Sequence, residues 1–148
     1  ADAPVVSSDL GRAAATADAI AAGRPRLPHE RGLREIHFGA WEARPFAEID
    51  AEDGPLLRCY LEQPGDVAPP GGESWNALCA RVGAVVDTLT GMGGDVIAVA
   101  HFGTILSQVQ RATGCPAAEV FGQEVAPLSV TRIVLDGRWR LEDINLRP

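Results

Sequence analysis

Two kinds of hydrophobic pattern alternate along the chain: short apolar runs, and longer stripes at helical spacing. The apolar runs at residues 4–6 and 96–100 have the length of buried strands. The second run is uninterrupted, which is typical of a parallel strand covered on both faces. Helical spacing follows each run, over residues 10–20 after the first and over about residues 104–112 after the second. Each run therefore predicts a unit of strand, tight turn and helix.

The middle of the chain is predicted to hold further helices within a less regular stretch. Short helices are expected around Pro45–Ala51 and Pro55–Glu62. A longer apolar face at helical spacing then runs over residues 75–89, with Ser74 as its N-cap and Gly91 at its end.

Turn-forming residues mark where other elements begin and end. Any of the residues Ser7–Asp9 can cap the first helix, and Gly23 is expected to stop it. Asp136-Gly137 is a strong signal for a two-residue turn and predicts a β-hairpin between residues 129–135 and 138–145.

Strands that alternate with helices favour an α/β fold. We expect residues 1–148 to form a single domain, a three-layer α/β/α sandwich with a mostly parallel sheet and a C-terminal β-hairpin. Ligands of such sheets bind outside the carboxyl ends of the strands. Polar residues follow both strands there, at Ser7–Arg12 and at His101–Gly103, so we expect the functional site at these two turns.

Composition narrows the range of partners. The chain has 13 basic and 20 acidic residues and a net charge of −7, which argues against nucleic acids and anionic membrane surfaces. All the cations are arginine, so the choice of arginine at any one position carries little weight. No apolar run is long enough to span a bilayer, and no secretory leader is visible. The 3 cysteines lack metal-ligand spacing and are expected to be reduced, which predicts a cytoplasmic protein without a metal site.

Three residues are candidates for chemistry, and each has a simpler interpretation when taken alone. Arg12 lies in the first turn of a predicted helix, where backbone N–H groups already favour an anion. The same position is equally compatible with a surface arginine that contacts only solvent. His101 ends a buried strand, where it could also be a structural histidine bonded to a backbone carbonyl. Glu35 lies in a segment of mixed polarity, where a glutamate is usually just solvated.

Taken together, the polar segments resemble the ordered motifs of the histidine phosphatase (phosphoglycerate mutase-like) superfamily. Those motifs read S-S-x-L-x-R-A-x-x-T-A, L-x-E-x-x-x-G-x-W-E-G, P-G-G-E-S with a later R-V, and V-S-H-G-G-x-I. The matching stretches are Ser7–Ala17, Leu33–Glu42, Pro70–Ser74 with Arg81-Val82, and Val99–Ile105. Several motifs in the same order over most of the chain make the resemblance specific.

The resemblance implies a role for each candidate. Arg12 would bind two phosphate oxygens in fork geometry. Glu35 would be the general acid that protonates the leaving oxygen. His101 would stabilise the charge that develops on the transferring phosphoryl group, and the backbone N–H of Phe102 would add a donor at the start of the following helix.

The implied activity is hydrolysis of phosphate monoesters through a phosphohistidine, with no metal or other cofactor. Its substrate would be a small phosphorylated metabolite. In this family an Arg-His-Gly triplet at the end of the first strand supplies the nucleophile, and no such triplet occurs in these 148 residues. We therefore expect the first strand, its loop and a helix to lie upstream of Ala1.

Other functions stay open at this point. A mutase is the closest rival, although mutases commonly carry long lid insertions and the segment 43–70 is modest. A phosphatase for a nucleotide-loop precursor of cobalamin, or one of broad specificity, would fit the motif at 33–42 equally well. A catalytically inactive phosphate-binding or interaction module is the alternative if the chain truly starts at Ala1. The sequence does not determine the oligomeric state.

Two positions depart from the family pattern. Phe102 stands where the family commonly has glycine, which affects the shape of the pocket floor, and Ala43 replaces the glycine that usually follows Trp-Glu.

Overall fold

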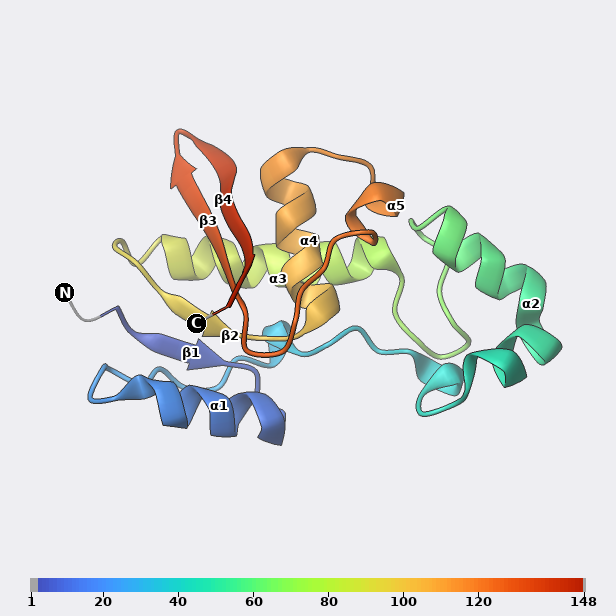
Figure 1. The fold of residues 1–148 in the computed structure, drawn as a ribbon, viewed down its shortest axis with the longest axis horizontal. Coiled ribbons are helices and arrows are strands. Elements are labelled where there is room, and N and C mark those ends of the chain that lie inside the picture. The colour runs from blue at the N-terminus through green and yellow to red at the C-terminus, as the bar shows by residue number, and fades with distance from the viewer. Residues whose placement is uncertain (1–2, 148) are drawn as a thin grey trace.

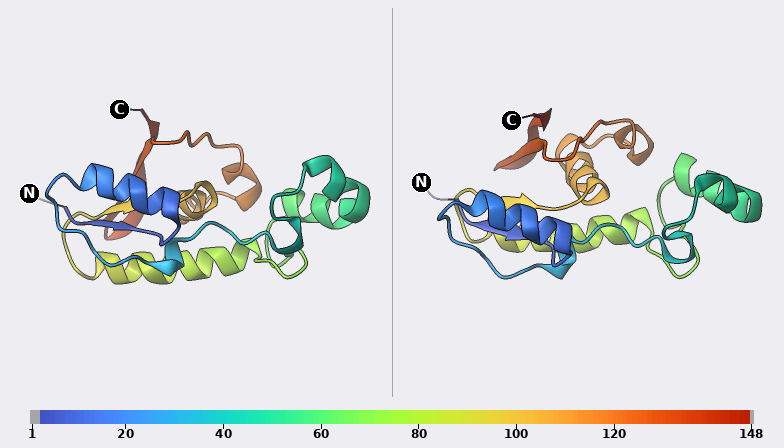
Figure 2. Two further views of the ribbon diagram at one scale, coloured as in Figure 1. Left: turned by 90° about the horizontal axis from the view of Figure 1, so that it is seen from below. Right: turned by 60° about the horizontal axis from the view of Figure 1, so that its bottom comes forward.

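The computed structural model describes residues 3–147. A two-stranded parallel sheet lies between helices, and its strands are β1 (Val5–Ser7) and β2 (Ile97–Val99). The register pairs Val5 with Ile97 and Ser7 with Val99, so both strands end at the same edge. Helix α1 (Gly11–Ala21) lies on one side of this sheet, and α3 (Trp75–Thr90) and α4 (Phe102–Thr113) pack together on the other (Figures 1 and 2).

The predicted hairpin is confirmed. Strands β3 (Val130–Asp136) and β4 (Arg138–Leu146) are antiparallel and turn at Gly137, whose φ of +66° suits glycine. The hairpin forms a sheet of its own and packs on α4. There the Arg111 guanidinium lies 4.5 Å from the centre of the Trp139 ring. The expected α/β class, with a parallel sheet and a C-terminal hairpin, is thus observed.

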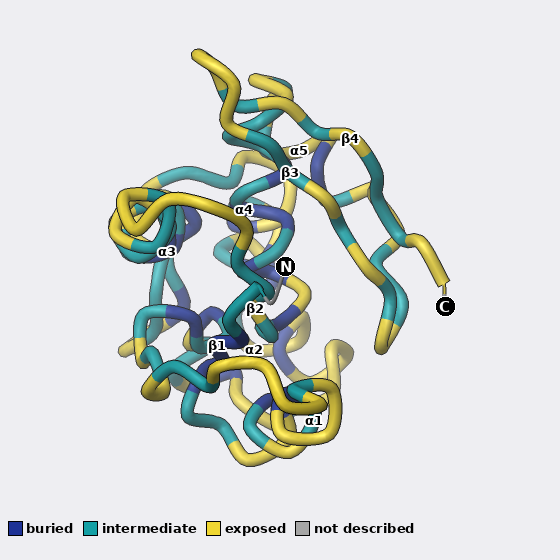
Figure 3. Tube along the Cα trace, turned by 90° about the vertical axis from the view of Figure 1, so that its left-hand side faces the viewer, coloured by how far each residue is buried: buried dark blue, intermediate teal, exposed yellow. Residues whose placement is uncertain are grey.

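The burial predicted for residues 96–100 is wrong for part of β2. Strand β1 is buried and bonded on both edges, since Leu27 N–H donates to the Val5 carbonyl while β2 pairs on the other side. Strand β2 pairs with β1 alone among the described strands, and none of its residues is buried, whereas all those of β1 are (Figure 3). Ala98 is exposed, so the elements of residues 3–147 cover the apolar run only in part.

The segment between α1 and α3 carries two short 3-10 helices, η1 (Arg31–Leu33) and η2 (Gly39–Trp41), and then α2 (Phe46–Glu62). Helix α2 extends away from the sheet (Figure 1) and merges the two short helices that the sequence predicts, with a bend at Asp53 where φ is −124°. The short α5 (Ala117–Val120) follows α4. One hydrophobic core connects these parts; its members include Val6, Leu33, Trp41, Leu78, Val82 and Leu106.

The caps of the two predicted helices differ from each other. Ser74 caps α3 as expected, since its Oγ accepts from Ala77 N–H at 3.1 Å. The predicted cap of α1 is wrong: its N-cap is Leu10, and no side chain caps it. The reason is that Ser8 and Asp9 have other partners, His101 for the hydroxyl and Arg34 for the carboxylate.

Gly39 allows two loops to meet. Its φ is +54°, and a Cβ there would collide with the carbonyl oxygen of Pro70. The same carbonyl accepts from Ala40 N–H at 2.8 Å. This close approach sets the segment around Glu35 against the loop that precedes α3.

Ala43 has a φ of +55°, a left-handed conformation that costs an alanine about 1–2 kcal/mol. Glycine removes this strain but loses about 0.4–1 kcal/mol through the entropy of the unfolded chain. We therefore expect Ala43→Gly to raise the free energy of unfolding by about 0.5–1 kcal/mol, measured by urea denaturation. Ala40→Gly, at an exposed position of η2 without positive φ, should instead lower it.

Candidate active site

The turns that follow β1 and β2 lie side by side, as the sequence predicts for parallel strands. Ser8 N–H donates to the Val99 carbonyl at 3.2 Å, and Ser8 Oγ lies 2.7 Å from His101 Nε2. Both side chains are buried. His101 is the N-cap residue of α4, so its ring stands at the positive end of that helix.

Arg12 lies in the first turn of α1 and is exposed. Within residues 3–147 no hydrogen bond or ion pair engages its guanidinium. Its charge nevertheless acts on His101, because it contributes to the lowered pKa of that imidazole. Arg12 thus follows β1 at the same sheet edge where His101 follows β2, and its donors are available to a ligand.

Glu35 reaches this turn from the irregular segment after η1. Its Oε1 accepts from Ile36 N–H at 2.9 Å, and its Oε2 accepts from Gly103 N–H at 3.2 Å. A Cβ on Gly103 would lie 2.7 Å from Glu35 Oε1. A larger residue at position 103 would therefore require the Glu35 carboxylate to shift from its place beside the first turn of α4.

The pKa of His101 is lowered, first by burial and then by the charge of Arg12, while Glu35 acts in the opposite direction. The folded protein thus favours the neutral imidazole. As the pH falls below the usual value of 6.5, the unfolded chain binds the proton first, so the free energy of unfolding falls. We expect His101→Asn to lose less stability than the wild type between pH 8 and pH 5.5, measured by urea denaturation.

The wild type, measured in the same buffers, is the reference. An unchanged pH dependence in His101→Asn would mean that His101 does not contribute to it.

The structure brings Arg12, Glu35 and His101 to one edge of the parallel sheet. Phe102 is the first residue of α4, its backbone N–H lies in the first turn, and its side chain is 47% exposed. The role of that N–H as an anion donor stays a prediction. His29 lies beside the end of β1, with its Nδ1 3.2 Å from Ser7 Oγ.

Sequence reasoning missed two contacts that arrange the site. One is the hydrogen bond of Ser8 with His101, and the other is the two-pronged ion pair of Asp9 with Arg34, with both N···O distances 2.6 Å. The hydrogen bonds from Arg34 and its charge hold the pKa of Asp9 at about 2. Only sequence position could have indicated these contacts, because Ser8, Asp9 and Arg34 lie close in sequence to the motif residues Arg12 and Glu35.

A family model described as histidine phosphatase superfamily (branch 1) matches residues 1–147. The chain belongs to the histidine phosphatase superfamily. This finding confirms the family that the sequence motifs indicate.

Two proteins of Mycobacterium tuberculosis are similar to this histidine phosphatase chain in sequence. The bifunctional protein Rv2228c is 33% identical over 97% of the chain, and the chain spans 40% of its length. A glucosyl-3-phosphoglycerate phosphatase is 36% identical over 68% of the chain, and the match covers 50% of the length of that phosphatase. The chain thus spans about half or less of these relatives.

Solved structures agree with the family. The mycobacterial glucosyl-3-phosphoglycerate phosphatase in complex with VO3 is 31% identical, with a TM-score of 0.82 over 97% of this chain and 77% of that one. The protein YhfR of Bacillus stearothermophilus is 26% identical, with a TM-score of 0.83 over 97% of this chain and 72% of that one.

Two hollows of the described residues lie away from Arg12, Glu35 and His101. The larger, about 440 Å³, runs between α3 and α4 and is lined by residues such as Cys79, Asp87 and Arg111. The smaller, about 220 Å³, adjoins Glu30 and Val85.

Residues 3–147 contain no group of three histidine, cysteine or acidic side chains placed to hold a metal ion. No helix among them is long and apolar enough to cross a membrane.

Proposed function

We propose that this chain is part of a phosphomonoester hydrolase that works through a phosphohistidine and needs no metal. The observation that carries the proposal is the convergence of Arg12, Glu35 and His101 on the turns after β1 and β2. A cation, a carboxyl group and an imidazole at a helix N-terminus supply what phosphoryl transfer requires: anion binding, charge stabilisation and a proton. The phosphatases among the relatives support the same reaction class.

In the first step a histidine nitrogen attacks phosphorus, so a P–N bond forms and the P–O bond to the leaving group breaks. Glu35 gives its proton to the leaving oxygen. In the second step water attacks the phosphohistidine, and the Glu35 carboxylate takes a proton from that water while the P–N bond breaks. Arg12 and His101 bind the phosphoryl oxygens in both steps, and the first-turn N–H of Phe102 adds a further donor.

The attacking histidine is proposed to come from an Arg-His-Gly segment outside residues 1–148, because no such triplet occurs in the sequence. The second edge of β2 is the natural place for the strand that carries it. No strand within residues 3–147 pairs along that edge, and β2 ends two residues before His101. We refer below to a protein containing residues 1–148 together with this segment as the full-length protein.

Metal independence tests the proposal. The full-length protein should hydrolyse phosphate monoesters in excess EDTA, because arginine charge and imidazole N–H donors stabilise the phosphoryl group where a metal does so elsewhere. A radiolabelled phosphoryl group should be trapped on a histidine during turnover, as an adduct stable in alkali and lost in acid. Residues 1–148 alone should not turn over, because the covalent route needs the nucleophile.

Two results would contradict this proposal. Activity that disappears with EDTA and returns with a metal ion would exclude the metal-free mechanism. Robust turnover by residues 1–148 alone would show that the nucleophile lies within them.

A mutase is the second candidate. One relative, a probable phosphoglycerate mutase of Salmonella paratyphi B, is 30% identical over 87% of the chain. A mutase returns the phosphoryl group to a second hydroxyl of the substrate, whereas a phosphatase passes it to water. Incubation with a monophosphoglycerate therefore separates the two: release of inorganic phosphate supports the phosphatase, and isomerisation supports the mutase.

A further inference from the structure

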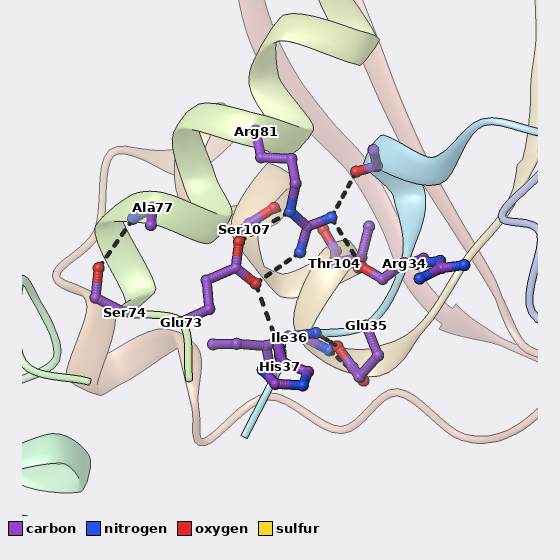
Figure 4. A network of polar contacts seen from close by, with 12 residues as sticks. Arg34, Glu35, Ile36, His37, Glu73, Ser74, Ala77, Arg81, Thr104 and Ser107 are labelled. Atoms are coloured by element: carbon purple, nitrogen blue, oxygen red, sulfur yellow. Dashed lines mark hydrogen bonds and ion pairs between the residues drawn. The ribbon is translucent and has the colours of Figure 1, made fainter. Parts of the chain in front are cut away.

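Arg81 on α3 donates hydrogen bonds from all three nitrogens of its guanidinium. Its Nε and Nη2 donate to the two carboxylate oxygens of Glu73 at 2.8 Å and 2.7 Å. Its Nη1 donates to the carbonyls of Gly32 and Arg34, at 2.8 Å and 3.1 Å (Figure 4). The side chains of Arg81 and Glu73 are 29% and 17% exposed, so the Arg81–Glu73 pair is largely shielded from water.

Glu73 extends these contacts to the other side of Glu35. Its Oε2 accepts from His37 N–H at 3.3 Å, and its own N–H donates to the His37 carbonyl at 2.7 Å. The backbone before Glu35 is thus tied to Arg81, and the backbone after it to Glu73. Thr104 of α4 adds a bond from its hydroxyl to the Arg34 carbonyl at 2.9 Å.

The backbone of Glu35 has no regular structure to hold it. Residues 34–38 belong to neither a helix nor a strand, so the direction of the Glu35 side chain depends on contacts from outside the segment. Neither Arg81 nor Glu73 bonds the Glu35 carboxylate, whose partners are the N–H groups of Ile36 and Gly103. Any effect of the pair on Glu35 therefore passes through the backbone.

The charge state of Glu73 agrees with this arrangement. Burial works to raise its pKa, but the hydrogen bonds and charge of Arg81, together with the His37 N–H, hold the pKa below its usual value. The arrangement thus favours the ionised Glu73 carboxylate, the form that pairs with Arg81. Shielded ion pairs often add little to stability relative to apolar residues, and in some proteins they specify one conformation instead.

We propose that the Arg81–Glu73 pair is a positioning device for the general acid: it fixes the backbone on both sides of Glu35 and so holds its carboxyl group beside His101 and the first turn of α4. This inference rests on the proposed role of Glu35. Arg81 and Glu73 are positioning residues, because their hydrogen bonds go to each other and to backbone groups on either side of Glu35.

The first test follows backbone amides and needs no catalysis. In Arg81→Met, the amides of Ile36 and Gly103 should exchange with solvent deuterium faster than in the wild type, while core amides such as that of Val109 keep their rate. Arg81→Met also leaves Glu73 without its partner, so Glu73→Gln/Arg81→Met, which removes both charges, is measured alongside. Unchanged exchange at Ile36 and Gly103 in both variants would overturn the proposal.

The second test uses the leaving group in the full-length protein. Misplacement of a catalytic group by about 1 Å can lower the rate by ~100-fold. Arg81→Met and Arg81→Lys should therefore lower kcat/KM for an alkyl phosphate by about 10–100-fold. The loss for p-nitrophenyl phosphate should be much smaller. In a Glu35→Gln background, Arg81→Met should cause no further loss on the alkyl phosphate. Equal losses on both substrates, or additive losses, would make the pair merely structural and overturn the proposal.

The matched control is Arg111→Met, which breaks the ion pair of Arg111 with Asp87 between α4 and α3, where the N···O distance is 2.6 Å. That pair does not contact residues 32–37, so the ratio of the activity on the alkyl phosphate to that on p-nitrophenyl phosphate should stay at the wild-type value.

Failure of the positioning proposal can be distinguished from failure of the proposed role of Glu35. If Glu35→Gln itself lowers both substrates equally, the general acid role of Glu35 fails, while amide exchange still decides whether the pair positions Glu35.

Discussion

Glu35→Gln is expected to lower kcat/KM of the full-length protein for an alkyl phosphate by about 10²–10⁴-fold, while p-nitrophenyl phosphate loses far less. The physical reason is the charge on the leaving oxygen. An alkoxide must be protonated as it departs, whereas p-nitrophenolate is stable without a proton. Steady-state kinetics on the two substrates measure the difference directly.

The matched control is Glu42→Gln, in the same sequence motif but at an exposed position, where its Oε1 accepts from Phe38 N–H at 2.9 Å. It should leave the ratio of the two activities unchanged. If Glu35→Gln lowers both substrates by the same factor, Glu35 binds substrate uniformly or is structural, and the proton has another source.

Arg12→Met is expected to lower kcat of the full-length protein by about 10²–10³-fold on both substrates, the range for removal of one donor to a developing oxyanion. Unlike the effect of Glu35→Gln, this loss should not depend on the leaving group, because the transferred phosphoryl group is the same in both reactions. Orthovanadate, which adopts the geometry of the transferring group, should also inhibit the variant less strongly.

Arg24→Met is the control, because Arg24 lies just beyond the other end of α1, where it is exposed and donates to the Ile20 carbonyl. It removes the same charge and should retain wild-type kinetics. An equal loss of kcat in Arg24→Met and Arg12→Met would mean that Arg12 acts through the overall electrostatic field of the protein and not through contact with the phosphoryl group.

The elements that could be predicted from sequence are those with a local cause. The period of apolar residues over 75–89 and the hydroxyl of Ser74 define α3, and Asp136-Gly137 defines the hairpin. The position of the candidate site also followed from a general rule: parallel strands end at one edge, and Arg12 and His101 follow two such strands.

The remaining features depend on partners far away in sequence. Ser8 and Asp9 are good helix caps by composition, but His101 and Arg34 engage them, and neither contact can be read from local pattern. The exposure of Ala98 likewise depends on which other elements lie against β2. Arg81 belongs to a recognisable motif, yet its contacts with the carbonyls on one side of Glu35 emerge only from the fold.

The pairing of β1 with β2 also has a consequence for the order of folding. The register joins Val5 to Ile97, so all the residues between these two form a loop that must close before the parallel pair exists. Long loops close slowly, whereas the hairpin and the contacts of α3 with α4 span far fewer residues. We therefore expect the sheet edge that carries Arg12 and His101 to form late in folding. An anion that binds both residues consequently reports on the complete fold and would bind no partly folded intermediate in the same way.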